Sequence, residues 1–332
     1  MKKLSVWVFI AWVGVVSVGV AREAITIAFW NVENLFDLVD DPATNDDEFA
    51  IGGRKNMTPE ILDLKLDHMA QVLTDLDADI IGLCEVENRL VLDMLNQRYP
   101  GRDYAIVHYD SPDSRGIDVA LLYDDSVFTV LDSRPVPVVL PDDKTTRDIL
   151  YVRGLYREEE LHIFVNHWPS KWGGVEATIP LRAQAAQTLR REIERILMND
   201  PKAEIIVIGD LNDEPTDPSV EKHLGATMER EKIGTAPYIL LNLMKPFYRK
   251  KNCGTYKYNN KDLVYDQIIV SPGLVDSSGL AIVPESVHVA DNPQYRQASG
   301  PYSGYPFRFW VRDKLLGGYS DHMAVSVSIE KR

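Results

Sequence analysis

The segment IIVIGDLNDEP, Ile205–Pro215, constrains the fold more than any other part of the chain. Its first four residues are β-branched, and an uninterrupted run of such residues is typical of a buried strand. The strand leads through Gly209 into a dense group of oxygen-bearing side chains that includes Asp210, Asn212 and Glu214. A turn accounts for one or two such residues, so this density needs a further explanation.

Strands and helices alternate along the rest of the sequence. Thr58 as N-cap and Pro59 at the first helical position begin an amphipathic helix whose apolar residues recur every three to four positions. We also expect helices at Arg89–Arg98 and Pro180–Met198. The expected strands cover residues 24–30, 78–88, 105–108, 117–123, 127–131, 148–156, 161–168, 205–208, 263–271 and 322–330.

This pattern predicts an α/β fold. Many strands with few helices favour two packed sheets with helices outside, an α/β sandwich. No linker divides the sequence, so residues 22–332 are expected to form a single domain. We also expect the protein to be a monomer with no stable protein partner. Residues 284–318 are rich in Gly, Pro and aromatic residues and are expected to form a long surface loop.

The N-terminus resembles a secretory signal. Lys2 and Lys3 precede a long uncharged run, and Gly19 and Ala21 supply the small residues of a cleavage site. We expect residues 1–21 to be a signal peptide and the mature protein to be secreted or periplasmic after cleavage near Ala21. The alternative is a retained transmembrane anchor, since a run of about 18 residues could barely span a bilayer.

Charge and cysteine content narrow the function classes. The net charge is -14 over 332 residues, whereas nucleic-acid binders usually show a basic footprint. A polyanionic substrate would therefore have to be met by a local basic patch or by bound cations.

The two cysteines, Cys84 and Cys253, are too few for a disulfide framework. Cys84 is expected in the core, and whether the two form a disulfide stays open.

Polar residues lie at an end of six of the expected strands. One Asp at a strand end is usually a turn or cap residue, and one His there is more often structural than catalytic. Six such positions are harder to dismiss, because a sheet gathers active-site residues at one edge. The residues concerned are Asn31, Glu85, Asn166, His167, Asp210, Asn212, Asp266, Asp321 and His322.

The motifs around these residues resemble those of the endonuclease/exonuclease/phosphatase superfamily, which includes deoxyribonuclease I, and indicate a secreted, bacterial-type member. The match runs from about Ile25 to Val327, and the pairing of Gly-Asp-x-Asn with a late Ser-Asp-His is its most specific part. The resemblance implies a four-layered α/β sandwich, two packed mixed β-sheets flanked by helices. The motifs are FWNVENLFD, CEVEN, VNHWPSK, GDLNDEP, YDQIIVS and YSDHMAV.

The resemblance also implies a role for each residue in divalent-metal hydrolysis of a phosphoester. Glu85 resembles the principal metal ligand, with Asn31 and Asp321 completing that site. Asp210 resembles the residue that orients or deprotonates the attacking water, with Asn212 beside it. His322 resembles the histidine that hydrogen-bonds the scissile phosphate, with Asp266 as its partner, and a second catalytic histidine corresponds to His167.

Elementary chemistry supports these roles. A phosphodiester is an anion, so its hydrolysis needs charge neutralisation, an oriented water and help for the leaving oxygen. Mg²⁺ prefers carboxylate and carbonyl oxygens and needs only one or two protein carboxylates, which Glu85 and Asp321 would supply; Mn²⁺ and Ca²⁺ are alternatives. A carboxylate such as Asp266 would keep the His322 imidazole charged and aimed.

Several further residues have two interpretations each. Arg115 could contact phosphate or be a solvated turn residue, and Asp118 is expected near the site. Trp168 and Lys171 could bind a phosphate chain with bases to stack on, although Trp168 could equally pack in the core. Arg147 and Arg153 are expected on a strand surface. The 284–318 loop could be a substrate lid or could shield the sheet edge.

These observations leave three functions open. The first is a secreted metal-dependent nuclease that hydrolyses DNA or RNA by in-line attack of water. The second is a phosphodiesterase or phosphatase acting on lipid headgroups or inositol phosphates, which suits the acidic chain better because fewer phosphates need neutralising. The third, a non-catalytic protein of the same fold, is disfavoured because every polar residue that the chemistry needs is present.

Overall fold

A computed structural model describes residues 24–276 and 278–332 of the chain. The expected signal peptide, residues 1–21, lies outside these residues. Within the described part, no helix is both long enough and apolar enough to cross a membrane. Both cysteines are free, with Cys84 buried as expected and Cys253 partly exposed.

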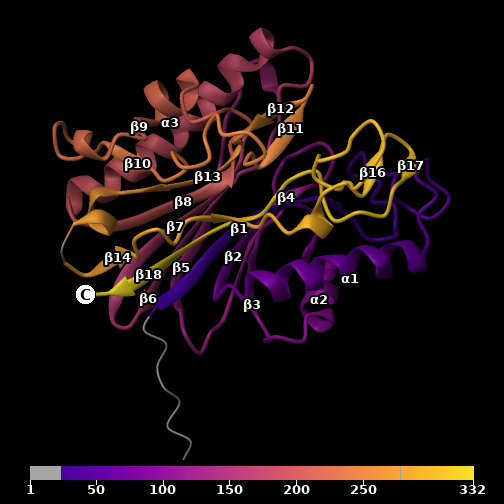
Figure 1. Cartoon of the computed structure of the whole chain (residues 1–332), viewed down its shortest axis with the longest axis horizontal. Coiled ribbons are helices and arrows are strands. Elements are labelled where there is room, and N and C mark those ends of the chain that lie inside the picture. The colour runs from indigo at the N-terminus through magenta and orange to yellow at the C-terminus, as the bar shows by residue number, and fades with distance from the viewer. Residues whose placement is uncertain (1–23, 277) are drawn as a thin grey trace, which may run out of the picture.

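Two mixed sheets, each of seven strands in the described residues, form the centre of the molecule (Figure 1). In the first sheet the order is β14 (Leu280–Ile282), β18 (Val325–Lys331), β1 (Ala24–Leu35), β2 (Ile80–Val86), β4 (Asp118–Tyr123) and β3 (Ala105–His108), with β15 (His288–Val289) also paired to β18. In the second sheet it is β5 (Thr129–Val136), β6 (Ile149–Tyr156), β7 (Glu159–His167), β8 (Glu204–Asp210), β13 (Asp266–Val270), β10 (Leu240–Asn242) and β9 (Ala226–Thr227).

Helices cover the outer faces of the two sheets. Helices α1 (Pro59–Leu76) and α2 (Arg89–Arg98) lie on the first sheet, and α3 (Val175–Asn199) lies on the second (Figure 1). Two small hairpins, β11 (Tyr256–Tyr258) with β12 (Lys261–Leu263) and β16 (Trp310–Val311) with β17 (Lys314–Leu315), stand apart from the sheets. Short helical turns occupy Pro141–Asp143, Ser219–Leu224, Arg230–Lys232, Pro272–Val275 and Pro293–Tyr295. The predicted four-layered α/β sandwich is therefore confirmed.

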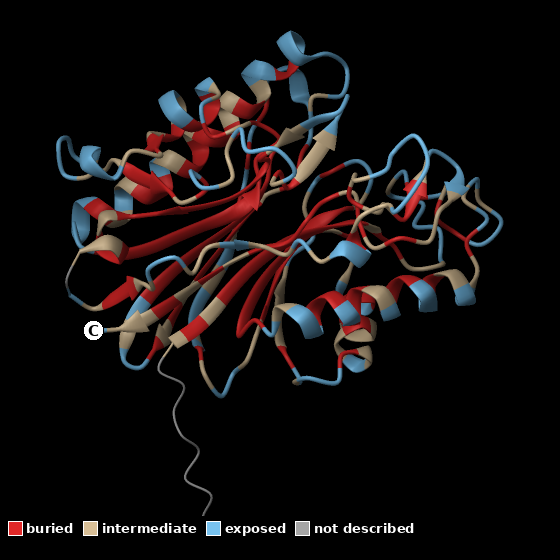
Figure 2. Ribbon diagram, viewed as in Figure 1, coloured by how far each residue is buried: buried red, intermediate tan, exposed pale blue. Residues whose placement is uncertain are grey.

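Burial of both faces explains why the central strands are mostly hydrophobic. In β8, Ile206 and Ile208 point into the core between the sheets, while Ile205 and Val207 point into the core beneath α3. Because a strand places successive side chains on opposite faces, a strand covered on both sides has apolar residues at most of its positions. Figure 2 shows the resulting buried strands at the centre of the molecule and the exposed residues outside them.

Several element boundaries differ from those predicted, and the differences at α3 and β5 have clear causes. Helix α3 begins at Val175, five residues before the expected start, and Pro180 lies inside it. Proline prefers the first helical position, and this preference explains the misplaced start. Strand β5 runs from Thr129 to Val136 rather than over 127–131, because it pairs with β6 as far as Ile149.

Candidate active site

The topology brings the polar strand ends to one edge of the sandwich. Strands β1 and β2 are parallel, as are β7 and β8, so Glu85, His167 and Asp210 lie where β2, β7 and β8 end, and Asn31 lies beside them where the pairing of β1 with β2 changes register. Strand β13 is antiparallel to β8, and its first residue, Asp266, pairs directly with Asp210. Strand pairing alone therefore places the carboxylates of two distant segments side by side.

His322 lies between the carboxylates of Asp266 and Asp210. Its Nδ1 is 2.7 Å from Asp266 Oδ2, and its Nε2 is 3.7 Å from Asp210 Oδ2. The Ser320 hydroxyl accepts from the His322 backbone N–H and donates to the carbonyl of Asn31, which ties this turn to β1. The face of the imidazole stacks on Tyr256, with ring centroids 4.7 Å apart.

These contacts keep the imidazole of His322 charged. Burial alone would lower its pKa, but the carboxylates of Asp266 and Asp210 raise the pKa well above its ordinary value. A histidine held in this way donates from both ring nitrogens. Since Asp266 accepts from Nδ1, the Nε2–H is free to donate to an anionic substrate.

Asp210 is a stronger base than the sequence suggests. Burial raises its pKa to about 6, with a contribution from Asp266, against the opposing effect of His322. Asn31 Nδ2 donates to its Oδ2 at 3.0 Å, and the Asn212 backbone N–H donates to its Oδ1 at 2.9 Å. The carboxylate is thus fixed in orientation and ionised at neutral pH.

Glu85 occupies a strained position at the end of β2. Its φ is 63°, in the left-handed region that favours glycine, and the pairing with β4 shifts register between Cys84 and Val86. Such strain costs about 1–3 kcal/mol and clusters at active sites. The carboxylate accepts from the Asn34 backbone N–H at 3.0 Å and from Asn31 Nδ2 at 3.3 Å.

The environment of Glu85 fits a divalent cation. Burial raises the pKa of its carboxyl group, with a contribution from Asp321, against the opposing charges of Arg115 and His322. Among the described residues, the one basic side chain within ion-pair distance of it is the His167 imidazole, at 3.8 Å. A buried carboxylate whose positive counter-charges, Arg115 and His322, lie beyond ion-pair distance is a suitable ligand for a hard cation.

The other two expected metal ligands have partners of their own. Asn31 places its Nδ2, rather than its oxygen, toward Glu85 and Asp210, while its Oδ1 accepts from the Glu33 backbone N–H at 3.0 Å. Asp321 pairs with Arg308 at 3.2 Å. Metal coordination by Asn31 and Asp321 stays a prediction. Asp210, Asp266 and His322 also lie close enough together to hold an ion, with one donor atom from each within 4.8 Å.

His167 lies beside Glu85 and Asp210, and its imidazole is neutral whereas that of His322 is charged. Its Nε2 is 3.8 Å from both Glu85 Oε1 and Asp210 Oδ2. Burial, reinforced by the charges of Arg147 and Arg115, lowers its pKa well below the ordinary value. The site therefore holds one neutral and one charged imidazole.

Arg147 is buried beside the site, so its expected place on a strand surface is wrong. It is 6% exposed, and it donates to Asp113 at 2.9 Å and to the Trp168 carbonyl at 2.7 Å. Asp113 also accepts from Arg115, which remains half exposed, and the contact of Arg115 with substrate stays a prediction. Arg153, in contrast, pairs with Glu160 at the surface.

Two of the three expected substrate-binding residues have other partners. Trp168 is 1% exposed and donates from Nε1 to Asn166, so it is a core residue and cannot stack on a substrate. Its neighbour Trp172 is 89% exposed. Lys171 is 2.9 Å from Asp213 and 3.2 Å from Asp217, so its ammonium group is already paired and its contact with substrate stays a prediction.

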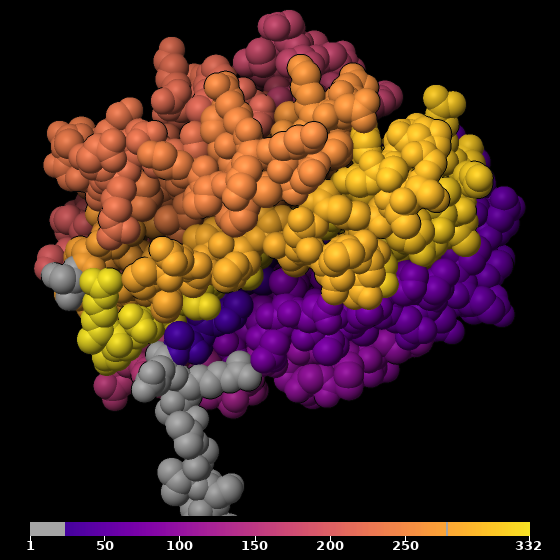
Figure 3. All heavy atoms as spheres, viewed as in Figure 1, coloured from indigo at the N-terminus to yellow at the C-terminus, as the bar shows by residue number. Residues whose placement is uncertain are grey.

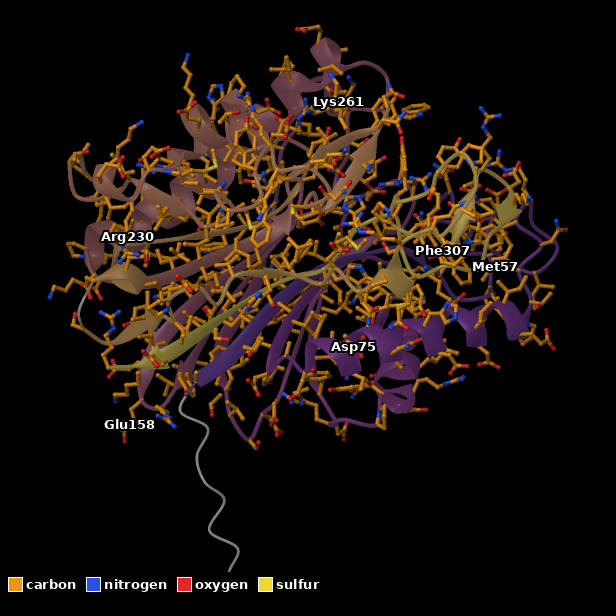
Figure 4. The ribbon with its side chains drawn as sticks, viewed as in Figure 1. Met57, Asp75, Glu158, Arg230, Lys261 and Phe307 are labelled. Atoms are coloured by element: carbon orange, nitrogen blue, oxygen red, sulfur yellow. The ribbon has the colours of Figure 1, made fainter. Side chains whose placement is uncertain are left out.

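The 284–318 segment packs against the body of the molecule. Glu33, on β1, accepts from the backbone N–H groups of Phe309 and Trp310 at 2.6 and 2.8 Å. Phe309 is fully buried in the core beneath α1, which favours the shielding alternative over a free lid. In Figure 3 the C-terminal part of the chain lies across the boundary between the N-terminal and middle parts. Phe307 is labelled near Met57 in Figure 4.

Glu85, His167, Asp210, Asp266 and His322 form the candidate catalytic group, called the catalytic group below. Sequence reasoning missed two residues next to it. Tyr256 contacts the His322 ring, and Arg308 contacts Asp321. Tyr256 lies on the β11–β12 hairpin, whose turn residues Asn259 and Asn260 both have positive φ. Alternating residues flanking Asn-Asn could have revealed this hairpin. Arg308 has no comparable local signal.

Comparison with known proteins agrees with the geometry. The sequence profile of the Endonuclease/Exonuclease/phosphatase family matches residues 26–331. No curated protein sequence shows a significant match to the chain.

Solved structures share the fold at low sequence identity. The D. rerio TDP2 complex with single strand DNA product has a TM-score of 0.57 and 14% identity, covering 93% of this chain and 99% of that one. An endonuclease/exonuclease/phosphatase family protein from Bacteroides thetaiotaomicron has a TM-score of 0.57 and 18% identity, covering 93% and 98%. The human Nocturnin catalytic domain with bound sulfate has a TM-score of 0.55 and 15% identity, covering 93% and 95%.

Proposed function

Because the chain belongs to the Endonuclease/Exonuclease/phosphatase family, we propose that it is a divalent-metal-dependent phosphodiesterase that hydrolyses nucleic acid. The observation that carries this proposal is the charged imidazole of His322 held between Asp266 and Asp210. An arrangement of a buried base, a fixed cationic donor and an adjacent carboxylate without a close counter-charge suits attack of water on an anionic ester.

Each residue has a distinct task in this proposal. Asp210, oriented by Asn31 and by the Asn212 backbone, accepts the proton of the attacking water. His322 donates from Nε2 to a phosphoryl oxygen, and Asp266 preserves its charge and direction. The neutral imidazole of His167 adds a second hydrogen-bonding group beside Asp210.

A divalent ion completes the charge balance. Glu85 would hold it, with Asn31 and Asp321 nearby, and Mg²⁺ is the proposed ion. When bound, such an ion stabilises negative charge on the phosphoryl oxygens.

A basic segment that contacts the catalytic group through one of its residues supports nucleic acid as the substrate. Segment 249–261 contains Arg249, Lys250, Lys251 and Lys261, which are all exposed, in a chain with a net charge of -14. The same segment carries Tyr256 against His322, so it reaches the catalytic group. Lys261, at the start of β12, is labelled in Figure 4. The D. rerio TDP2 structure, which shares the fold, contains a DNA product.

Two further proposals rest on the sequence. Residues 1–21 act as a signal peptide, and the mature chain, residues 22–332, works outside the cytoplasm as one domain and as a monomer. The acidic chain favours a second candidate substrate, a lipid headgroup or inositol phosphate, which would require fewer phosphate contacts.

A substrate panel tests the proposed function. Purified protein is incubated with plasmid DNA, single-stranded DNA, total RNA, sphingomyelin and inositol polyphosphates, in Mg²⁺ and in EDTA. We expect Mg²⁺-dependent cleavage of nucleic acid. Release of phosphocholine or phosphate with intact nucleic acid would support the second candidate, and no turnover of any phosphoester would contradict both.

A further inference from the structure

A second group of potential metal ligands lies outside the catalytic group, where β3 meets β4. His108 ends β3, Asp118 begins β4, and Asp110 lies in the connection between them. His108 Nε2 is 3.3 Å from Asp118 Oδ2, and Nδ1 is 4.0 Å from Asp110 Oδ1. One donor atom from each of the three residues can be chosen so that all lie within 4.8 Å of one another.

The imidazole of His108 is buried without a hydrogen bond. Its side chain is 5% exposed, and Nε2 has no hydrogen-bond partner although the Asp118 carboxylate is so close. Leaving a buried polar nitrogen unpaired costs about 1–3 kcal/mol. The neighbouring Ser111 hydroxyl is likewise buried without a partner. A metal ion that accepts an electron pair from His108 Nε2 would remove the cost at that atom.

The separation of one ligand pair fits a small transition-metal ion, and the Asp110 carboxylate, which lies on the Nδ1 side of the ring and is 91% exposed, can rotate toward it. Ligands about 2.0–2.2 Å from a tetrahedral ion lie roughly 3.3–3.6 Å from one another, which matches the separation of His108 Nε2 and Asp118 Oδ2. Asp118 Oδ1 accepts from the Ser111 backbone N–H at 2.9 Å, which aims Oδ2 at the imidazole. A carboxylate fixed in this way is a preorganised ligand.

We propose that His108, Asp110 and Asp118 bind a divalent transition-metal ion, with Zn²⁺ as the best fit, at a site separate from the catalytic group. Imidazole with carboxylates suits Zn²⁺ or Mn²⁺, whereas Ca²⁺ takes six to eight oxygen ligands. A small cavity bordered by Ser111, Asp118 and Asp148 lies next to the cluster and leaves room for a water ligand.

The ion would fix the base of a loop that reaches the catalytic group. His108 and Asp118 flank the connection 109–117, which carries Asp113 and Arg115. Asp113 holds the guanidinium groups of both Arg115 and Arg147. Closing this loop with a metal would therefore hold those arginines in place, which gives the site a positioning role.

Zn²⁺ binding to the full chain tests the proposal directly. Protein freed of metal with EDTA is titrated with Zn²⁺ by isothermal calorimetry in a Glu85→Gln background, which disables the expected catalytic ligand. We expect one tight equivalent of Zn²⁺, which His108→Gln abolishes and Asp110→Asn weakens by about tenfold or more. His288→Gln, which replaces an exposed histidine on β15, is the matched control and should leave binding unchanged.

A second measurement guards against misfolding. Asp110 is exposed, so Asp110→Asn should keep the wild-type melting temperature, and Zn²⁺ should slow hydrogen exchange over residues 109–117 in the wild type alone. The proposal is overturned if the Glu85→Gln protein binds no Zn²⁺. It is equally overturned if His108→Gln and Asp110→Asn bind it like the control.

Discussion

Asp266 Oδ2 lies 2.7 Å from His322 Nδ1, and this contact joins the start of one sheet strand to a turn 56 residues further along the chain. The carboxylate is fully buried, as is expected for a group whose task is to act on its neighbour. The pair determines the charge state of the site, because Asp266 is the main cause of the raised pKa of His322.

Asp266→Asn should therefore lower turnover and change its pH dependence. Without the carboxylate the pKa of His322 falls, so the imidazole loses its charge at lower pH. We expect kcat to drop by about 10²–10⁴-fold, the range for general acid–base help. In a pH–rate profile, the alkaline limb should move to lower pH. An alkaline limb at the wild-type position would contradict the assigned role of Asp266.

Asp210→Asn should lower activity without lowering stability. The wild type holds an ionised carboxylate at a site where burial raises its pKa to about 6, so removing the charge relieves a desolvation cost. We expect turnover to fall by orders of magnitude while the melting temperature at pH 8, without metal, stays equal or rises. Asp125→Asn, at an exposed position, is the control for both measurements. A large loss of stability would show that Asp210 is chiefly structural.

Glu87→Gln should raise stability at high pH alone. Burial raises the pKa of Glu87 to about 8, so the folded protein retains a proton that the unfolded chain releases near the ordinary pKa of 4.5. The contribution of Glu87 to the free energy of unfolding is therefore largest at low pH. This contribution is lost as the pH rises toward about 8. The Gln side chain resembles the protonated acid and should raise the melting temperature at pH 9, by about 2–4 °C per kcal/mol.

Thermal unfolding at pH 5 is the internal control for Glu87→Gln, because the wild-type group is already protonated in the folded protein there. The nearby Asp46 Oδ1 is buried without a hydrogen bond and can accept from the new amide. Equal stabilisation at both pH values would show that the effect does not come from ionisation.

Much of the site could be predicted because it lies at strand ends. Asp210, Asp266 and His322 each follow or precede a continuous apolar run, and the pairing of neighbouring strands brings such residues to one edge. The outer layers could be predicted as well, since the amphipathic pattern after Thr58 marks α1 with its cap.

Other contacts depend on packing that no local pattern encodes. Arg147 resembles an ordinary strand arginine, and only its contacts with Asp113 and the Trp168 carbonyl explain its burial. Trp168 follows His167, a candidate catalytic residue, yet its ring packs in the core beneath α3. Arg308 reaches Asp321 from a segment with no periodic pattern.

The basic segment 249–261 should determine affinity for a polyanion. Lys250 and Lys251 are exposed and lie in the segment that reaches His322. Replacing both with Gln should raise KM for single-stranded DNA. The slope of log K against log salt concentration should become shallower by about 1.4, since each phosphate that is no longer neutralised contributes roughly 0.7. Hydrolysis of a small diester such as bis(p-nitrophenyl) phosphate should not change.

A second pair of exposed lysines provides the matched control for this variant. Lys222 and Lys232 lie on the short helices Ser219–Leu224 and Arg230–Lys232, outside the basic segment. Replacing both with Gln removes the same amount of charge and should leave KM and the salt slope close to those of the wild type. An unchanged salt slope in the variant that lacks Lys250 and Lys251 would place the substrate path elsewhere.

The Mg²⁺ dependence of Glu85→Gln tests the central claim most directly. Cleavage of a labelled oligonucleotide is followed while Mg²⁺ is titrated into EDTA-treated wild type and variant. We predict that the wild type is inactive without the ion and saturates as it is added, whereas Glu85→Gln loses about 10²-fold or more in activity at every Mg²⁺ concentration and needs more ion for half its maximum. Wild-type cleavage in EDTA, or a variant that matches the wild type across the titration, would contradict the account.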